Sequence, residues 1–299
     1  MALLYILQGI RSPITDYLAL AFICFGSELF FLCVSSVIFW CFSKKAAYKL
    51  VFTFAFFGPL IILANIIAQV PFPWVSQTGL STLPQIAAAA DGFSFPSIGI
   101  FTASVLCAVI FINNHNISVK ISCAAVAMLT IAAYLYLGLC STWSAAVSLV
   151  LAAVFSFLFT KFADGMLFDI RQYPIYLLIS SIPTFILLVV SVFIYLNGLI
   201  SLKVFSTSLR LTGMSAALLF SWFFESNFVR FSIRCSRSGQ LLKAVIGSAS
   251  TIITWPVLYF VLNLIPDFWP AGFICNVIVT VGAFSIYPFF IRGVFSSAY

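Results

Sequence analysis

The chain has 299 residues, of which 63% are hydrophobic and only 7% are charged. A water-soluble domain of this composition would expose large apolar patches, so the sequence excludes an ordinary soluble protein and favours one that is surrounded by lipid. The net charge of +7 does not indicate a nucleic-acid partner, because the basic residues form short clusters between apolar segments and no continuous stripe.

Apolar segments of about 20 residues recur along the chain, and each is long enough to cross the hydrocarbon core of a bilayer as a helix. They predict an all-α fold, a polytopic helical membrane bundle of about nine transmembrane helices. The expected spans, in chain order, are residues 17–42, 46–70, 97–113, 120–140, 142–162, 173–196, 205–225, 241–264 and 271–292.

The basic residues between these spans predict the orientation of the bundle. Eleven of the fourteen fall on one side, namely Lys44, Lys45, Lys49, Lys120, Lys161, Arg171, Arg230, Arg234, Arg237, Lys243 and Arg292. Because cytoplasmic loops carry an excess of lysine and arginine, we expect the N-terminus outside and the C-terminus in the cytoplasm.

The longest connection expected outside comprises residues 71–96, which include three prolines before the last and the acid Asp91. Such a segment is either an interfacial lid or a plain extracellular loop. Asp91 is the only acid near this face, and one carboxylate cannot hold a catalytic metal, so no metal site is expected. The eight cysteines show no C-x-x-C spacing and are interpreted as small buried hydrophobes. No cofactor is predicted.

Three segments of the first half share the order and spacing of a catalytic pattern. The first runs from Asn65 to Phe72-Pro73, the second is Gly-Phe-Ser-Phe-Pro-Ser-Ile-Gly at residues 92–99, and the third, residues 133–144, contains Tyr-Leu-Gly. Upstream stand Ile-Leu-Gln, Arg-Ser-Pro, Gly-Ser-Glu and Trp-Cys before a pair of lysines. Together, over residues 5–160, these segments resemble the type 2 phosphatidic acid phosphatase superfamily, the membrane lipid phosphate phosphatases.

The resemblance implies that the catalytic residues have been lost. The family carries a Lys and, after six intervening residues, Arg-Pro, then Pro-Ser-Gly-His, then an Arg, a His and an Asp. The matched positions here are Asn65, Phe72, Pro73, Ser97, Gly99, Tyr134, Cys140 and Ser144. If the segments lie at the outer ends of the second to fifth spans, these residues converge on one degenerate, outward-facing pocket.

The family's reaction needs one His to attack phosphorus, a second His to protonate the leaving group, and Lys and Arg to hold the phosphoryl oxygens. The only His of this chain, His115, is expected in a cytoplasmic turn across the membrane from the pocket. Cys140 would need a neighbouring cation or a helix N-terminus to become a thiolate nucleophile, and the matched positions offer no cation. We therefore interpret Cys140 as structural and assign no catalytic residue.

Two charged residues are expected inside the membrane. Glu28 lies in the middle of the first span, where a carboxylate is costly unless it faces a partner or water. It is either a functional residue or a structural hydrogen-bonding partner of a neighbouring helix. Arg210, near the outer end of the seventh span, can pair with Glu28 or with a lipid phosphate, but snorkelling to the interface is the preferred interpretation.

The sequence thus predicts a lipid-phosphatase-like transmembrane core at residues 1–165, followed by additional transmembrane helices at residues 166–299. The expected function is that of a pseudoenzyme, an inactive homologue that binds a lipid, isoprenoid or phospholipid, or a partner membrane protein. The alternatives are a subunit of an amphiphile transporter or flippase, and a membrane enzyme of unrecognised chemistry. By resemblance to bacterial members, the expected location is the bacterial cytoplasmic membrane.

Overall fold

The computed structural model describes residues 2–90, 92–166, 173–233, 235–265 and 268–295. Within these ranges the regular structure is entirely helical, which confirms the expected all-α class. Asp91, Arg171, Arg234 and the C-terminal Tyr299 lie outside the described residues.

The helices follow one another with short connections. Their bounds are α1 (Ala2–Gly9), α2 (Pro13–Ile23), η1 (Cys24–Gly26), α3 (Glu28–Val37), η2 (Ile38–Phe42), α4 (Lys44–Ala68), α5 (Pro73–Ser76), α6 (Pro84–Ala89), α7 (Ile98–Asn113), α8 (Ile117–Tyr136), α9 (Thr142–Met166), α10 (Tyr173–Leu196), α11 (Leu202–Phe224), η4 (Glu225–Val229), α12 (Arg237–Leu262), α13 (Ala271–Val281), η5 (Gly282–Ile286) and α14 (Tyr287–Phe295).

Six helical stretches in the described residues are long and apolar enough to cross a membrane, and α2 with α3 makes a seventh if this pair, bent by 61°, is one span. The other two expected spans contain α7, which has only 16 residues, and α11. The buried face of α11 carries Ser208, Thr212, Ser215 and Ser221, which lowers its apolar content. The structure therefore establishes a membrane-type helical bundle but not a count of nine spans.

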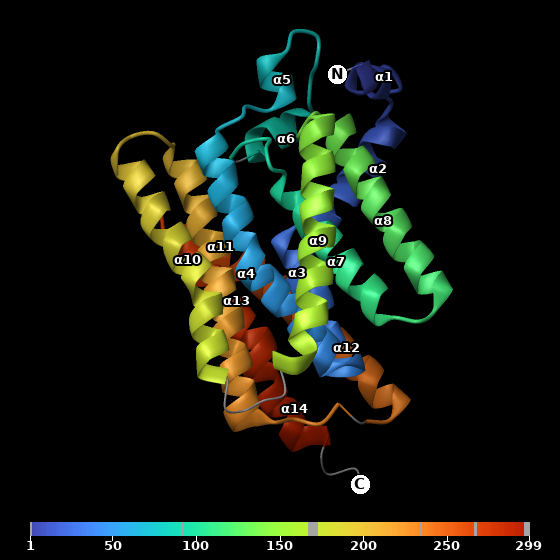
Figure 1. The fold of residues 1–299 in the computed structure, drawn as a ribbon, viewed down its shortest axis with the longest axis vertical. Coiled ribbons are helices and arrows are strands. Elements are labelled where there is room, and N and C mark those ends of the chain that lie inside the picture. Colours follow the sequence, from blue (N-terminus) through green and yellow to red (C-terminus); the bar gives the residue numbers. More distant parts are fainter. Residues whose placement is uncertain (1, 91, 167–172, 234, 266–267, 296–299) are drawn as a thin grey trace.

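Helix α4 lies at the centre of the bundle. It packs against α10 and α11 on one side and against α7 and α9 on the other (Figure 1). Aromatic side chains pack around α4: the rings of Phe31 in α3 and Phe54 are 4.3 Å apart, and those of Phe52 and Trp222 in α11 are 4.7 Å apart. This dry, close-packed centre fixes the helices that surround the candidate site.

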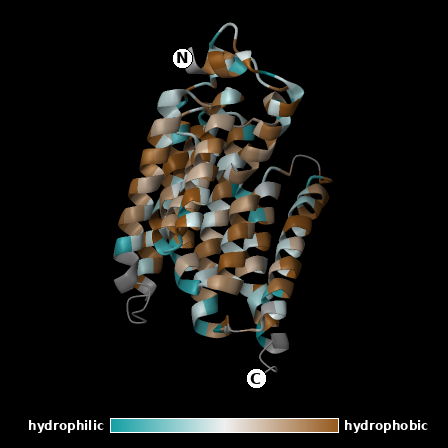
Figure 2. Ribbon diagram, turned by 90° about the vertical axis from the view of Figure 1, so that its right-hand side faces the viewer, coloured by the Kyte–Doolittle hydropathy of each residue, from teal (hydrophilic) through white to brown (hydrophobic). Residues whose placement is uncertain are grey.

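The outer helix faces are apolar, as Figure 2 shows. In the span Ser238–Leu262, which contains most of α12, only 11% of the most apolar window is buried inside the protein. Its exposed side chains include Ile253, Val257 and Phe260. Such a surface is stable only in contact with lipid tails, which agrees with the composition of the chain.

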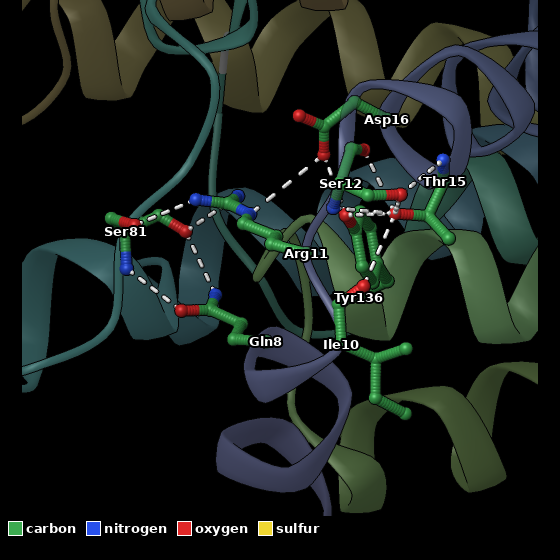
Figure 3. Close-up of polar contacts among 8 residues, drawn as sticks. All are labelled: Gln8, Ile10, Arg11, Ser12, Thr15, Asp16, Ser81 and Tyr136. Atoms are coloured by element: carbon green, nitrogen blue, oxygen red, sulfur yellow. Dashed lines mark hydrogen bonds and ion pairs between the residues drawn. The ribbon is translucent and has the colours of Figure 1, made fainter.

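The end of the bundle that carries α1, α5 and α6 is covered by residues 71–96 (Figure 1). A polar cluster ties this segment to the N-terminal helices (Figure 3). The Arg11 guanidinium donates from Nη1 to Ser81 Oγ (2.7 Å) and from Nη2 to the Ser81 carbonyl (3.0 Å), and the Gln8 amide donates to the same carbonyl (2.7 Å). Tyr136 of α8 donates to Asp16 Oδ1 (2.6 Å), so α8 is held by the same cluster.

The opposite end, near α14, carries a second polar cluster. The Lys44 ammonium lies 2.5 Å from Glu225 Oε1, and the Tyr48 hydroxyl donates to the same carboxylate. Lys49 donates to Asn113 Oδ1 (3.1 Å), and Arg292 donates to the Val229 carbonyl (2.9 Å). Several residues of the expected cytoplasmic side therefore gather at one end of the molecule.

Candidate functional site

Glu28 begins α3, at the bend that separates this helix from α2 and η1. Ser27 is the N-cap residue, and its hydroxyl accepts the Phe30 N–H (3.2 Å). The carboxylate therefore lies at the positive end of the α3 dipole and not in the middle of a continuous helix. The expected uninterrupted span 17–42 is corrected in this respect.

The Glu28 carboxylate is held by two side chains from the C-terminal half. Arg210 donates from Nε to Oε1 (3.0 Å), and Asn276 donates from Nδ2 to Oε2 (2.7 Å). Asn276 also donates to the Arg210 carbonyl (3.0 Å) and accepts the Trp255 indole N–H (2.7 Å). This network joins α3, α11, α12 and α13, and it shows that Arg210 pairs with Glu28 and does not merely snorkel to the interface.

Sequence reasoning missed Asn276 and Trp255. Asn276 is fully buried in α13, within an otherwise apolar stretch. A buried amide in a membrane helix must find a hydrogen-bonding partner, so its position was a usable signal. The sequence did not reveal which charged residue that partner would be.

A cavity of about 480 Å³ lies beside this network. Residues 26–29, Phe72, residues 89–90, Phe93, residues 97–99, Thr102, Tyr134, Leu139, Thr207, residues 210–211 and Trp255 line it. Four residues of the degenerate pattern, Phe72, Ser97, Gly99 and Tyr134, therefore share one cavity with Glu28 and Arg210. The volume is in the range of sites that hold small molecules or lipid head groups.

Tyr134 occupies the space beside Gly99. A Cβ atom built on Gly99 would overlap the Tyr134 hydroxyl, and one built on Gly26 would lie 2.7 Å from that hydroxyl and 2.6 Å from the Gly99 carbonyl oxygen. The three residues thus form a tight contact between η1, α7 and α8. Any side chain at position 99 would require Tyr134 to move.

Asn65, by contrast, holds the loop that follows α6. Its amide donates to the carbonyls of Phe93 (2.8 Å) and Pro96 (2.9 Å), and its Oδ1 accepts the Phe93 N–H (3.3 Å). The side chain is 1% exposed and does not line the cavity. At the position of the family's lysine, this chain therefore has a loop anchor.

Two serines continue this anchoring. The Ser97 N–H donates to Ser148 Oγ (2.8 Å), and the Ser144 hydroxyl donates to the Ser94 carbonyl. Ser94 in turn donates from its backbone to the Val70 carbonyl (2.8 Å). These contacts fix the start of α7 against α9, so Ser144 supports the wall of the cavity without lining it.

Cys140 and Pro73 lie outside the cavity as well. Cys140 is fully buried with Leu4, Leu80 and Ala145, and this burial raises the pKa of its thiol. Pro73 is buried at the start of α5, and the preceding Phe72 stacks on Trp74 with ring centroids 6.1 Å apart. A nucleophilic cysteine must be accessible and must ionise readily, and Cys140 meets neither requirement.

His115 is exposed in the turn between α7 and α8. The cavity is lined by the first turn of α7, whereas His115 follows the end of this helix. Because α7 is roughly 24 Å long at 1.5 Å per residue, His115 lies far from the cavity. No group of three or more His, Cys, Asp or Glu residues suited to a metal ion occurs in the described part of the chain.

Two apolar cavities follow the first one along the same helices. A cavity of about 170 Å³ is lined by Phe30, Ala103 and Val126, among others, and one of about 590 Å³ by Val37, Val109 and Val119, among others. Along both α3 and α7 the cavities occur in the same order, and the two apolar ones share Val34 and Ile110. They therefore form a row from one end of the bundle towards the other.

The fold and the cavity define an all-helical membrane protein with a polar pocket at one end of its bundle. No protein-family model matches the sequence, and no curated protein matches it. Among solved structures, the crystal structure of LpxE from Aquifex aeolicus is similar, with 18% sequence identity and a TM-score of 0.48. The match covers 54% of this chain and 93% of that one. At this level the likeness carries no argument about the site.

Proposed function

We propose that this chain is a catalytically inactive relative of the lipid phosphate phosphatases that binds a membrane lipid in the cavity beside Glu28 and Tyr134. The observation that carries the proposal is the cavity itself. It remains open at the degenerate site, although Tyr134 has closed the space at Gly99 where the family carries a catalytic His. The cavity is also partly open to the surroundings, so a ligand can enter it from outside the bundle.

The lining supports binding better than catalysis. Its described residues include no His, Cys or Lys. Glu28 is the only carboxylate among them, and both of its oxygens accept hydrogen bonds from Arg210 and Asn276. A phosphoryl transfer needs an activated nucleophile and a proton donor for the leaving group, and no pair of side chains here supplies both.

The proposal includes the orientation of the protein. The segment 71–96 and α1 lie at one end of the bundle and α14 at the other, an arrangement that an odd number of crossings produces (Figure 1). With α7 and α11 counted as spans, the number is nine, and the cavity faces outward from the cytoplasmic membrane. Residues 1–165 form most of the lining, and Thr207, Arg210, Leu211 and Trp255 complete it from the C-terminal helices.

A pair of tryptophan substitutions tests the binding site. Ala90 lines the cavity, whereas Ala88, two residues earlier, is exposed outside it. We expect Ala90→Trp to fill the mouth and to reduce the lipid retained on the purified protein, measured by native mass spectrometry, while Ala88→Trp retains as much as the wild type. Equal retention in both variants would contradict the assignment. Co-purification of a membrane protein in place of lipid would favour a protein occupant.

The row of three cavities favours a second candidate function, the movement of an amphiphile across the membrane. The two apolar cavities continue from the polar one along α3 and α7. In this case, reconstituted protein accelerates the exchange of fluorescent phospholipids between the leaflets of a vesicle, and a bulky Ala103→Trp variant does not. Rates equal to those of protein-free vesicles would remove this candidate.

A further inference from the structure

The charges on the cavity wall indicate the kind of head group that fits. Among the described lining residues, Glu28 and Arg210 are the only charged ones, and they have opposite signs. Their side chains are 15% and 26% exposed, so both reach the cavity surface while remaining largely shielded from solvent. The described part of the wall therefore has no net charge but a strong local separation of charge.

A head group that carries charge of only one sign fits this wall poorly. A phosphate monoester would meet the Glu28 carboxylate, and the lysine and arginine of the family's phosphate clamp are replaced by Asn65 and Phe72. A purely cationic head group would meet the Arg210 guanidinium instead. In a shielded site such like-charge contacts are costly, because little water is present to screen them.

A zwitterionic head group satisfies both sides. Its ammonium lies against Glu28 and its phosphodiester against Arg210, so that the dipoles of ligand and wall oppose one another. Trp255 also lines the cavity; its indole donates to Asn276 and stacks on Tyr259 with ring centroids 5.2 Å apart, so a fixed aromatic side chain lies beside the carboxylate that would bind the ammonium. We infer that the outward cavity takes a phospholipid whose head group carries both an ammonium and a phosphodiester. This inference rests on the proposed function and deepens it.

Lipids with identical tails and different head groups test the inference. Wild-type protein is titrated, by native mass spectrometry, with dioleoyl phosphatidylethanolamine, phosphatidylglycerol, phosphatidate and the cationic lipid dioleoyl-trimethylammonium-propane. We expect phosphatidylethanolamine to bind roughly tenfold more tightly than the others, the difference that one charge-assisted hydrogen bond supplies. Equal affinities, or a preference for any of the other three lipids, would overturn the inference.

Variants that remove one of the two charges provide a second test, in which the head-group preference is measured. If the ion pair were merely structural, this preference would not change. Glu28→Gln should shift the preference towards phosphatidylglycerol, and Arg210→Gln should shift it towards the cationic lipid. Glu225→Gln is the matched control, because it breaks the Lys44–Glu225 ion pair, which does not line this cavity. An unchanged preference in both folded Glu28 and Arg210 variants would contradict the inference. If either variant fails to fold, the wild-type series still decides.

Failure of the proposed function has a different signature. If none of the four lipids binds, or if Ala90→Trp leaves all binding intact, the cavity is not a lipid site, and both proposals are wrong. If all four lipids bind equally well and Ala90→Trp abolishes this binding, only the inference of a zwitterionic head group is overturned. In that case the proposed function stands, and the lipid is recognised through its tails.

Discussion

The Tyr134 side chain lies where a residue larger than glycine at position 99 would place its first atom. Gly26 completes this contact from η1, so three chain segments meet around one phenol ring. The cavity beside the Tyr134 hydroxyl remains open.

A substitution at Gly99 measures how tight this contact is. We expect Gly99→Ala to lower the free energy of unfolding by about 1–3 kcal/mol, because the added methyl group overlaps the Tyr134 ring. Tyr134→Ala in the same chain should recover part of this loss, since it removes the atoms that overlap. Thermal unfolding in detergent provides the measurement. Strictly additive losses in the double variant would show that the two residues do not interact.

Cys140 provides a second test at the residue scale. Burial raises the pKa of its thiol, so the protonated form persists to higher pH than in an exposed cysteine. We expect N-ethylmaleimide to label exposed Cys24 first and to leave Cys140 unmodified between pH 7 and pH 9 until denaturant is added. Peptide mass spectrometry identifies the labelled residue. Rapid labelling of Cys140 in the folded protein would contradict its buried position.

At the scale of elements, the connection between α6 and α7 depends on Asn65 of α4. Three hydrogen bonds join its side chain to the backbone of Phe93 and Pro96. The position of the loop therefore depends on α4. The position of the start of α7, which lines the cavity, depends in turn on the loop. The sequence resemblance, which implies a lysine at position 65, gave no indication of this anchoring role.

Removing the anchor should loosen the loop. We expect Asn65→Ala to cost about 1–3 kcal/mol, because two backbone carbonyls lose their donor, and to make residues 71–96 more sensitive to protease. Asn197→Ala is the matched control, since Asn197 is exposed and its side chain donates to the Phe193 carbonyl (2.8 Å), one helical turn earlier. Equal protease sensitivity of the two variants would argue against an anchoring role.

At the scale of the whole molecule, composition and the apolar segments were sufficient to predict the helical membrane class and the approximate position of the long helices, but not the short helices α1, α5 and α6. They were insufficient for the bend at Glu28, although Ser27 is a good N-cap residue. The pairing of Glu28 with Arg210 depends on how α3 and α11 pack. Residues 182 positions apart in the chain meet there, and a single sequence does not contain that information.

The orientation of the bundle has a direct test. From the distribution of basic residues, a reporter inserted near Thr82 should be external and one fused after Tyr299 cytoplasmic. Thr82 belongs to the segment that covers the end opposite α14 (Figure 1). Paired alkaline phosphatase and fluorescent protein fusions report the two sides. Both reporters on the same side of the membrane would contradict the nine-span arrangement, in which seven spans separate the two positions.

The central claim is that the cavity holds a lipid without hydrolysing it. The most direct measurement is phosphate release from phosphatidate and from polyprenyl diphosphate by purified wild type and Cys140→Ala, with an active lipid phosphate phosphatase as positive control. The resemblance implies catalytic and phosphate-binding groups at the positions of Asn65, Phe72, Gly99, Tyr134, Cys140 and Ser144, and none of these side chains is a His, Lys or Arg, so we predict no release above background from either protein. Turnover by the wild type that disappears in Cys140→Ala would contradict the account and identify a cysteine nucleophile.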